Sequence, residues 1–387
     1  MNKLMRVHHI IASINLEIGG PAVSTTQLNR HLQTNGIQSE IHSIDYTRHG
    51  PLADPQAGPF VEAGWFTERS RGWNTSFQAQ TRQAIQSSPG IIHNHGCWMA
   101  PNLLARKLAH SLHLPFLISP RGMLEPWSMD FHSYKKKLAW KLYEQSNLSA
   151  ANAFHATSDA EVESIRQLGF RQPIYRIPNG VNVSPAPAKR PESLQQIISP
   201  FFLFLSRIHP KKGIDLLLRS WDSIKKDFPE WKLVIAGPDL DKYRETLDAQ
   251  FPSNDQIIWT GAVSGETKDW LLHHAAFLSL PTHSENFGIV IAEALAHQTP
   301  VLTTDQTPWT AIVDRDCGWV IAPEQAALTS TLKQALTTPS EQLKKMGQQG
   351  SDWMKAEFTW DTIADRMRQA YQHLSESGPA PDFAITE

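Results

Sequence analysis

Cysteine and long apolar runs are what this sequence has least of. Only Cys97 and Cys317 occur among its 387 residues, which is too few for a disulfide framework and typical of a reducing compartment. No window comes close to about eighteen uninterrupted apolar residues, so no transmembrane helix is predicted. The basic N-terminus is not followed by a sustained apolar run, so we expect no signal peptide. These patterns favour the cytoplasm.

A strong net charge is also missing. The formal charge of −2 gives no electrostatic footprint for binding nucleic acid. No Gly-x-Gly-x-x-Gly motif follows a predicted strand, which argues against a conventional NAD enzyme. With 41 % hydrophobic and 19 % charged residues, the composition is that of an ordinary globular protein. A chain of this length exceeds what a single core supports, so two domains are expected.

What the sequence does contain is a regular alternation of short apolar runs with helical patterns. This alternation predicts an α/β fold of two successive doubly wound, Rossmann-like domains with parallel sheets. A strand at 7–14 opens the first half, and a strand at 201–205 opens the second. Residues 182–200 lack a hydrophobic period and are rich in proline and alanine over their first half. We therefore place the domain boundary there.

The stretch 284–301 is the most informative one in the second half. Its apolar residues recur with helical spacing and fill most of the circumference, so it predicts a buried helix. Glu285 lies at the N-terminal edge of this helix and Glu293 lies inside it, with no Lys or Arg three or four residues from either. A buried carboxylate without donors is costly. The donors are either the hydroxyl groups of a ligand such as a sugar, or distant protein groups.

Cations are predicted close to these carboxylates. Arg207 and Lys212 lie on a loop between a strand and a helix, and Glu285 follows another strand of the same predicted sheet. Arginine offers a bidentate fork and lysine a point charge to phosphate oxygens, while carboxylates accept from sugar hydroxyls. This set suits a sugar attached to a diphosphate.

In the first half, a glycine loop precedes the first helix. Gly19, Gly20 and Pro21 join the first strand to an amphipathic helix that runs to about Thr34. The N-terminus of a helix after a glycine loop can receive an anion. A tight turn with no ligand explains the same residues equally well.

The predicted strand that ends at His93 leads into His95 and Cys97. These three residues alternate, so they would share one face of a strand, and they form an acceptable zinc set. The run offers no second pair of ligands, however, and ends in a glycine turn. We prefer a ligand crevice at the carboxyl end of the strand, with His95 facing it.

Arg121 follows the next strand on a loop that contains glycine, where it either contacts an anion or faces solvent. The helix predicted at 133–147 carries several lysines beside aromatic and aliphatic residues, and the stretch before it, at 123–131, is rich in apolar and aromatic residues. Such a segment suits the surface of an anionic membrane, although a solvated lysine face is the alternative.

Ser158 and Glu161 form a capping box at the start of a helix, and this structural role explains the presence of both residues. Residues 46–80 have no assigned structure.

These motifs together resemble those of a known family. The segments that carry the resemblance are Gly19-Gly20, Pro178-Asn179-Gly180-Val181, Arg207 with Lys212-Gly213, Ala236-Gly237, Thr260-Gly261, and Glu285-Asn286-Phe287-Gly288 with Glu293-Ala294. They are similar to the retaining glycosyltransferases of family 4 (glycosyl transferases group 1). The resemblance implies the GT-B fold, in which two Rossmann-like domains face each other across a cleft. The stretches at 95–99 and 121–127 resemble bacterial members that build surface polysaccharide or lipopolysaccharide.

The resemblance also implies roles for individual residues. Catalytic roles fall to Glu285, Arg207, Lys212 and His95, with Glu285 on donor sugar hydroxyls, Glu293 on the ribose, and Arg207 and Lys212 on the diphosphate. The implied donor site comprises Gly19, Gly20, Arg207, Lys212, Gly237, Gly261, Ala262, Val263, Glu285, Asn286, Phe287, Gly288, Ile289 and Glu293. The implied acceptor side comprises His95, Trp98, Arg121 and Trp127.

One position departs from the family. Many members carry histidine where this chain has Arg121, and arginine cannot act as a base at neutral pH. The proton of the acceptor would then pass to another group or to the leaving phosphate. The resemblance implies front-face transfer without a metal or another cofactor, because Asp239-Leu240-Asp241 and Asp314-Arg315-Asp316 fall in loops that the family does not use for metal. A covalent intermediate stays open.

The resemblance assigns the parts of the chain as follows. Residues 1–182 form the acceptor domain, 183–198 the linker and 199–358 the donor domain. A helix at 360–375 returns to the first domain, and 376–387 is expected to be a disordered tail. The expected partners are a nucleoside diphosphate sugar and a glycan or lipid-linked saccharide, with peripheral contact with the inner membrane left open. Two alternatives are a catalytically silent nucleotide-sugar sensor or assembly protein and a nucleotide-sugar epimerase.

Overall fold

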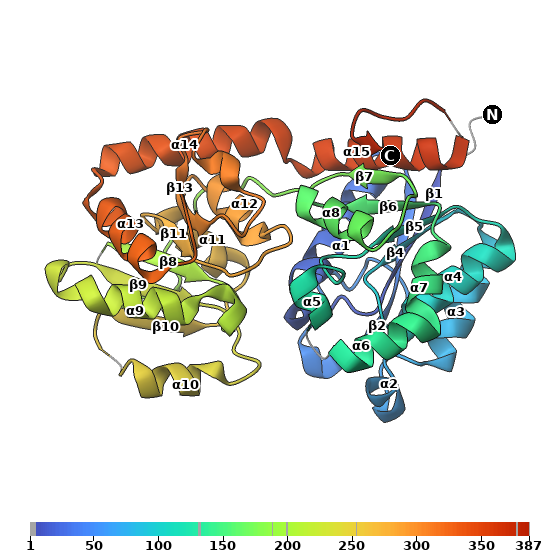
Figure 1. Ribbon diagram of the computed structural model, residues 1–387, viewed down its shortest axis with the longest axis horizontal. Helices are drawn as coiled ribbons and strands as arrows, with labels where there is room; N and C mark the ends of the chain where they lie inside the picture. The colour runs from blue at the N-terminus through green and yellow to red at the C-terminus, as the bar shows by residue number, and fades with distance from the viewer. Residues whose placement is uncertain are drawn as a thin grey trace. The chain divides into compact units, whose positions relative to one another are not determined.

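The computed structural model divides the chain into two compact units (Figure 1). It describes residues 5–130, 133–187, 189–198, 200–252, 254–376 and 378–386. Unit 1 comprises Met1–Gly180 and Trp360–Glu387, and unit 2 comprises Val181–Thr359. The chain thus enters unit 2 two residues before the expected boundary and returns to unit 1 at Trp360. Each unit contains a predominantly parallel sheet covered by helices, which confirms the predicted α/β architecture with two Rossmann-like domains.

The sheet of unit 1 has eight strands in the order β14-β7-β6-β5-β4-β1-β2-β3. Their bounds are β1 Arg6–Ile11, β2 Gln38–Asp45, β3 Phe60–Glu62, β4 Ile91–His95, β5 Phe116–Ser119, β6 Ala153–Ala156, β7 Ile174–Arg176 and β14 Ala384–Ile385. All neighbouring pairs are parallel except β14 and β7. The carboxyl ends of β1, β2, β4 and β5 therefore share one edge of this sheet.

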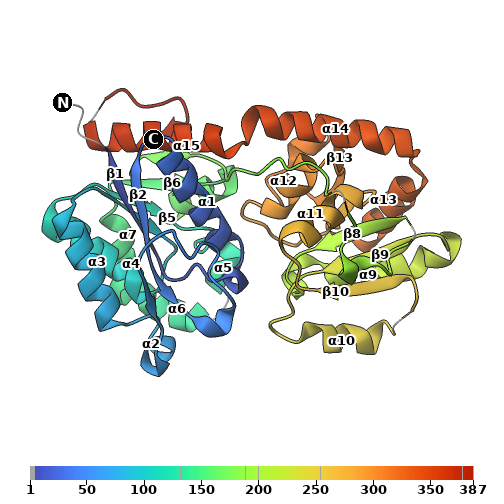
Figure 2. The same ribbon diagram turned by 180° about the vertical axis from the view of Figure 1, so that it is seen from behind.

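Helices cover both faces of this sheet. Their bounds are α1 Gly20–Thr34, α2 Trp65–Arg69, α3 Thr75–Ser87, α4 Ala100–Leu112, α5 Pro126–Asp130, α6 Ser133–Ala139, α7 Gln145–Ser149, α8 Asp159–Gln167 and α15 Trp360–Glu376, with a π-helical turn at Trp140–Glu144. Helices α1 and α15 pack side by side on one face (Figures 1 and 2), and α3 and α4 pack on the other. Much of the unassigned stretch 46–80 is thus β3, α2 and the start of α3.

The sheet of unit 2 has six strands in the order β10-β9-β8-β11-β12-β13, and all of its pairs are parallel. The strands are β8 Phe201–Leu205, β9 Lys232–Ala236, β10 Ile257–Gly261, β11 Leu278–Leu280, β12 Val301–Thr304 and β13 Gly318–Ile321. The helices are α9 Ile214–Ile224, α10 Tyr243–Gln250, α11 Gly265–His274, α12 Ile289–Ala296, α13 Gln325–Thr337 and α14 Ser340–Glu357. Strand β8 is apolar and buried throughout because helices cover both faces of a parallel sheet.

The helix predicted at 284–301 is shorter in the structure. It is α12, Ile289–Ala296, and Gly288 precedes it with a φ of 73°. Glu285 therefore lies in the loop before the helix rather than at its first turn, and Val301 already belongs to β12. The apolar pattern extended too far because the preceding loop and the following strand are buried as well. The predicted burial of the helix holds for five of its residues.

The tail expected to be disordered is partly ordered. After α15, Ala384 and Ile385 pair with Tyr175 and Ile174 as the antiparallel edge strand β14. A two-residue strand next to proline and glycine gives no periodic signal, so the sequence pattern could not reveal it.

The packing of α14 yields a test of the fold. Gly347 lies so close to the loop between α12 and β12 that an added Cβ would be 1.9 Å from the backbone oxygen of Gln298. We expect Gly347→Ala to lower the thermal unfolding midpoint, because backbone overpacking costs about 1–3 kcal/mol and outweighs the helix propensity gained. Gly378→Ala is the control, since its Cβ meets nothing within 4 Å. Equal midpoints for both variants would contradict this packing.

Candidate functional site

Two loops meet at the carboxyl edge of the sheet in unit 2. One follows β8 and the other follows β11. The backbone oxygen of Lys211 accepts hydrogen bonds from the Thr282 hydroxyl at 3.0 Å and from the His283 N–H at 2.9 Å. Gly213 has a φ of 68°, and a Cβ there would lie 1.9 Å from the Pro281 oxygen. Only glycine permits this approach, which brings the loops of Lys212 and Glu285 together.

Lys212 and Glu285 form an ion pair. The Lys212 ammonium contacts Oε2 of Glu285, and the two side chains are only 11 % and 15 % exposed. Glu285 is therefore not an unpaired acid: its partner comes from a loop 73 residues away in the sequence. The ion pair engages one of the two carboxylate oxygens of Glu285.

Glu293 also has a distant partner. Its Oε1 lies 2.7 Å from Nζ of Lys268 on α11, and the two side chains are 18 % and 27 % exposed. Burial alone would lower the pKa of Lys268, but the charge and hydrogen bond of Glu293 raise it. Distant protein groups thus provide hydrogen-bond donors to both glutamates, which was one of the two alternatives that the sequence left open. The spacing of residues in the sequence did not point to Lys268.

Other predicted donor-site residues line the same edge. The N–H of Gly237 donates to the oxygen of Gly261 at 2.8 Å, which joins the ends of β9 and β10. Arg207, just after β8, is exposed, as is Ala262 after β10, while Val263 is half-buried.

The turn before α12 carries the last group of donor-site candidates. Phe287 is buried against Trp309, whose indole N–H donates to the Phe287 oxygen. That carbonyl therefore already accepts one hydrogen bond from within unit 2. Gly288 and the half-buried Ile289 place the start of α12 at the sheet edge, next to Asn286. The first N–H groups of a helix have no partner within the helix, so this end suits an anion.

In unit 1, the glycine loop leads into α1 as predicted. Gly19 has a φ of 93° and caps the helix that begins at Gly20. No atom would crowd a Cβ at Gly19, so the backbone conformation and not space demands glycine. The loop borders a cavity of about 310 Å³ at the carboxyl ends of the strands. Its lining includes Ile11, Ser13, Pro21, His95, Arg121 and Met123.

A chain of hydrogen bonds holds Arg121 beside this cavity. One guanidinium nitrogen lies 3.0 Å from Nδ1 of His95, and the other donates to Asn179 at 2.9 Å. Because arginine only donates, Nδ1 of His95 accepts, and Nε2 of His95 donates to Nδ1 of His9 at 2.8 Å. Burial lowers the pKa of Arg121 to about 10, so the guanidinium stays charged at neutral pH. No carboxylate among the described residues hydrogen-bonds to it.

His95 is poorly suited to act as a base. Both ring nitrogens are engaged, and burial together with nearby positive charge lowers its pKa well below the ordinary value. The structure therefore makes His95 a positioning residue for Arg121.

Two further candidates lie in this region. Cys97, part of the zinc set that the sequence made the less favoured alternative, does not join His93 and His95 in a ligand cluster among the described residues, and burial raises the pKa of its thiol. Glu161 does more than take part in a capping box. Its Oε1 accepts from the N–H of Gly122 at 2.7 Å, which fixes the turn that presents Arg121.

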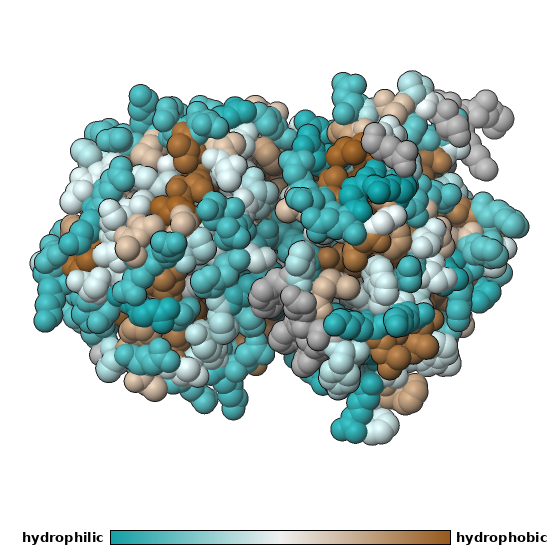
Figure 3. Space-filling model, in the orientation of Figure 1, coloured by the Kyte–Doolittle hydropathy of each residue, from teal (hydrophilic) through white to brown (hydrophobic). Residues whose placement is uncertain are grey.

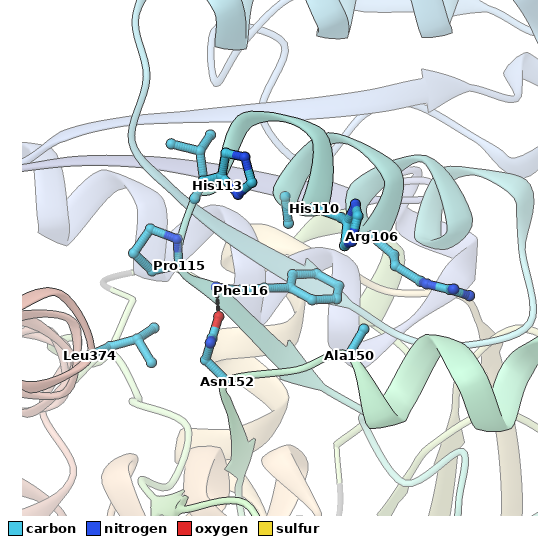
Figure 4. A pocket seen from close by; sticks show the side chains of 10 residues that line it. Arg106, His110, His113, Pro115, Phe116, Ala150, Asn152 and Leu374 are labelled. Atoms are coloured by element: carbon cyan, nitrogen blue, oxygen red, sulfur yellow. Dashed lines mark hydrogen bonds between the residues drawn. The ribbon is translucent and has the colours of Figure 1, made fainter.

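Of the aromatic acceptor candidates, Trp98 is not among the described residues that line the cavity. Trp98 packs against Trp140 with ring centroids 6.3 Å apart. The side chain of Trp127 lies outside the described part of the structure. A second cavity of about 410 Å³, rimmed by Arg106, His110 and His113, lies at the amino end of β5 (Figure 4). It is at the opposite sheet edge from Arg121, so we do not assign it to the site.

Comparison with known proteins places both halves of the chain in related families. Residues 18–185 match the family described as Glycosyltransferase Family 4, and residues 187–353 match Glycosyl transferases group 1. A D-inositol 3-phosphate glycosyltransferase of Xylanimonas cellulosilytica is 24 % identical over 94 % of each chain. Several other curated relatives match over less than two thirds of their own length, 40 % in the case of an alpha-1,3/1,6-mannosyltransferase of Schizosaccharomyces pombe.

Solved structures share the fold. Anabaena Alr3699/HepE, in complex with UDP and glucose, has a TM-score of 0.72 and 14 % identity over 95 % of this chain and 99 % of its own. WaaG, a glycosyltransferase involved in lipopolysaccharide biosynthesis, has a TM-score of 0.67 and 15 % identity over 96 % of this chain and 100 % of its own.

The buried histidines predict a pH dependence of stability. Burial lowers the pKa of His155 to about 3 from an ordinary 6.5, so between these values the unfolded chain binds a proton that the folded chain does not. Stability should therefore fall as the pH drops below about 6.5, by up to about 1.4 kcal/mol per pH unit for this group. We expect His155→Gln to reduce this slope, measured by denaturant unfolding at a series of pH values.

Ser119→Ala is the matched control. It removes the hydroxyl 2.7 Å from Nδ1 of His155 but keeps the titrating ring, so it should lower stability and preserve the slope. An unchanged slope in His155→Gln would contradict the buried neutral state.

Proposed function

The chain belongs to the glycosyltransferases with the GT-B fold, and we propose that it moves a sugar from a nucleoside diphosphate sugar to a saccharide or lipid-linked saccharide acceptor. The supporting observation is the convergence of Lys212, Glu285, Lys268 and Glu293 at one edge of the sheet in unit 2. Two partly buried ion pairs there hold two carboxylates and two ammonium groups in place for the hydroxyl groups and the phosphates of a donor.

The proposed donor site divides the work between its charges. Lys212 and the exposed Arg207 offset the charge that grows on the leaving diphosphate, which is the main electrostatic demand of the reaction. Glu285 accepts from hydroxyls of the donor sugar, and Glu293 accepts from the ribose. The start of α12 contributes backbone N–H groups to a phosphate. These charges perform the task without a metal ion in our proposal.

We assign the acceptor to unit 1, in the cavity beside Arg121. A charged guanidinium without a carboxylate partner suits an acceptor rich in hydroxyl groups or carrying an anion. Arg121 cannot take the acceptor proton, and His95 is held by Arg121 and His9. In our proposal the bond between the anomeric carbon and the phosphate oxygen breaks, the acceptor oxygen bonds to that carbon on the same face, and a phosphate oxygen of the leaving group takes the acceptor proton. That geometry retains the anomeric configuration.

We further place the reaction in the synthesis of bacterial cell-surface polysaccharide. The support is the resemblance of residues 95–99 and 121–127 to enzymes of that kind.

The retaining mechanism has a direct test. NMR of the product shows whether the transferred sugar keeps the anomeric configuration that it has in the donor.

The donor site generates a binding prediction. Removing a charged hydrogen-bond partner costs about 1.5–3 kcal/mol, so Glu293→Gln should weaken binding of the preferred nucleotide sugar by roughly 10- to 150-fold. Thermal shift against UDP-, GDP-, ADP- and dTDP-sugars identifies the preferred nucleotide, and calorimetry measures the affinity. Binding and sugar transfer should both survive EDTA.

Glu357→Gln is the control, because Glu357 forms an exposed ion pair with Arg315 elsewhere in unit 2. Equal affinity of Glu293→Gln and the wild type would remove Glu293 from the site. Saturable binding without transfer of a labelled sugar to any acceptor would instead favour the silent sensor, and loss of transfer with EDTA would contradict the metal-free mechanism.

Membrane contact is a second part of the proposal. No helix of the described residues is long and apolar enough to cross a bilayer. Tyr134, Leu138 and Leu142 are nevertheless 71 %, 61 % and 70 % exposed, at spacings of four residues. Lys137 and Lys141 lie next to them and are exposed. Figure 3 shows apolar surface beside hydrophilic surface in this region. We propose that this face rests on an anionic lipid surface.

Vesicle sedimentation tests this contact. Wild-type protein should bind vesicles that contain phosphatidylglycerol more strongly than vesicles of phosphatidylcholine alone. A variant with Leu138→Ser and Leu142→Ser should lose most of this binding, because apolar area contributes to insertion. Ile198→Ser is the control, since Ile198 is 82 % exposed but lies in unit 2. Undiminished binding of the double variant would contradict the proposal.

A further inference from the structure

Three metal-binding side chains converge near the amino ends of β1 and β2. His8 on β1 is directly paired with Glu40 on β2, and Ile10 is paired with His42. Alternate residues of a strand share a face, so His8, Glu40 and His42 all project from the same side of the sheet. The two histidines are buried, and the Glu40 side chain is 35 % exposed.

The ligand atoms of these residues form a small triangle. Nδ1 of His8 lies 3.1 Å from Nε2 of His42 and 2.8 Å from Oε1 of Glu40, and the third edge is 3.4 Å. In a tetrahedral zinc site with bonds of about 2.0–2.1 Å, two ligand atoms lie about 3.3 Å apart. The triangle therefore has nearly the size of one face of such a site.

The hydrogen bond on the far side of His8 fixes its tautomer. Nε2 lies 2.8 Å from the backbone oxygen of Ser88, which can only accept, so this nitrogen carries the hydrogen. In neutral His8, Nδ1 then turns a lone pair toward the carboxylate and toward His42. Metal-binding histidines typically donate their second ring N–H to a carbonyl in this way. Either a proton or a cation must lie between these electron-rich atoms.

We propose that His8, Glu40 and His42 bind a divalent transition metal of the zinc type. Two imidazoles and one carboxylate are an established ligand set for such an ion, with a water molecule in the fourth position. Glu40 borders an open cavity of about 240 Å³ with Arg6, Gln33, Gln38 and Ser39. That cavity gives the ion a path from solvent and gives the water molecule a place.

A second cluster in the same unit does not have this character. His9, His93 and His95 also bring ligand atoms close together. The nitrogens of His93 are 2.7 Å from the hydroxyls of Tyr371 and Ser119, and His95 is held by Arg121 and His9. The nearby guanidinium repels a cation, and the cluster contains no carboxylate. We assign it to the hydrogen-bond network of Arg121.

The position of the proposed ion gives it a structural role. His8 lies three residues before Ile11, where β1 reaches the cavity of Arg121. A metal would join β1, β2 and, through Ser88, the segment after α3. Such an ion stabilises the folded state by mass action without taking part in sugar transfer.

The test is metal binding to the full chain, freed of metal by dialysis against EDTA and carrying no histidine tag. We expect one equivalent of Co²⁺ to give the visible absorption of a tetrahedral site, and Zn²⁺ to displace it. Zn²⁺ should also raise the thermal unfolding midpoint. Glu40→Gln and His42→Asn should each weaken Zn²⁺ binding by at least about 100-fold, because loss of a ligand exceeds the effect of losing an outer hydrogen bond.

Asp361→Asn is the matched control. His31 lies 2.8 Å from Asp361 in the same unit, so this pair has a histidine and a carboxylate but only two ligands. It should leave Co²⁺ absorption unchanged, as should His9→Gln in the second cluster. The proposal fails if the wild type shows no tetrahedral Co²⁺ spectrum and no Zn²⁺-dependent rise in midpoint, since a shared proton then explains the triangle. It also fails if folded Glu40→Gln, checked by circular dichroism, binds the metal as tightly as the wild type.

Discussion

Burial of parallel strands on both faces decides where polar chemistry can lie in this protein. Every backbone group of such a strand is paired in the sheet, and helices exclude water from both sides. Ligand chemistry is then confined to the sheet edges, where strands give way to loops. In unit 2 the sheet follows this rule, because β8 is apolar throughout and the charged side chains cluster just after the strands. The loops hold their positions through close backbone approaches such as that of Gly213 to Pro281.

In unit 1, by contrast, polar side chains lie within the strands themselves, and hydrogen bonds between them replace contact with water. Its strands carry buried histidines, at positions 8, 9, 42, 93, 95 and 155. A buried polar ring is tolerated only when hydrogen bonds replace water. One series of bonds runs from His9 through His95 to Arg121, and another runs from His93 through Ser119 to His155. The first of these series holds the Arg121 guanidinium in place, because His95 bonds to it on one side and to the buried His9 on the other.

Features that depend on interactions between residues close together in the sequence were predicted correctly. Strand and helix periodicity predicted two Rossmann-like domains, and the glycine loop before α1 was located to the residue. Interactions between segments that lie far apart in the sequence were not predicted. Lys268 lies 25 residues from Glu293, and Glu40 meets His8 only through the register of β1 and β2. Side chains that meet through sheet register or between loops leave no periodic trace in one sequence. The hydrogen bond from the Gly122 N–H to Glu161 also joins distant segments, so the sequence predicted only the capping role of Glu161.

The two glutamates of unit 2 show what the structure adds. On spacing alone they were acids without partners, and a ligand was one of two ways to satisfy them. The structure supplies a lysine to each, so neither acid needs a ligand for the protein to fold. Each lysine contacts one oxygen of its carboxylate and so holds that side chain in one orientation. In the donor site that we propose, the hydroxyl groups of the sugar meet carboxylates that are already ordered, and the entropy of ordering those side chains has already been offset during folding. In that proposal the ion pairs favour binding because they are complete before the ligand arrives.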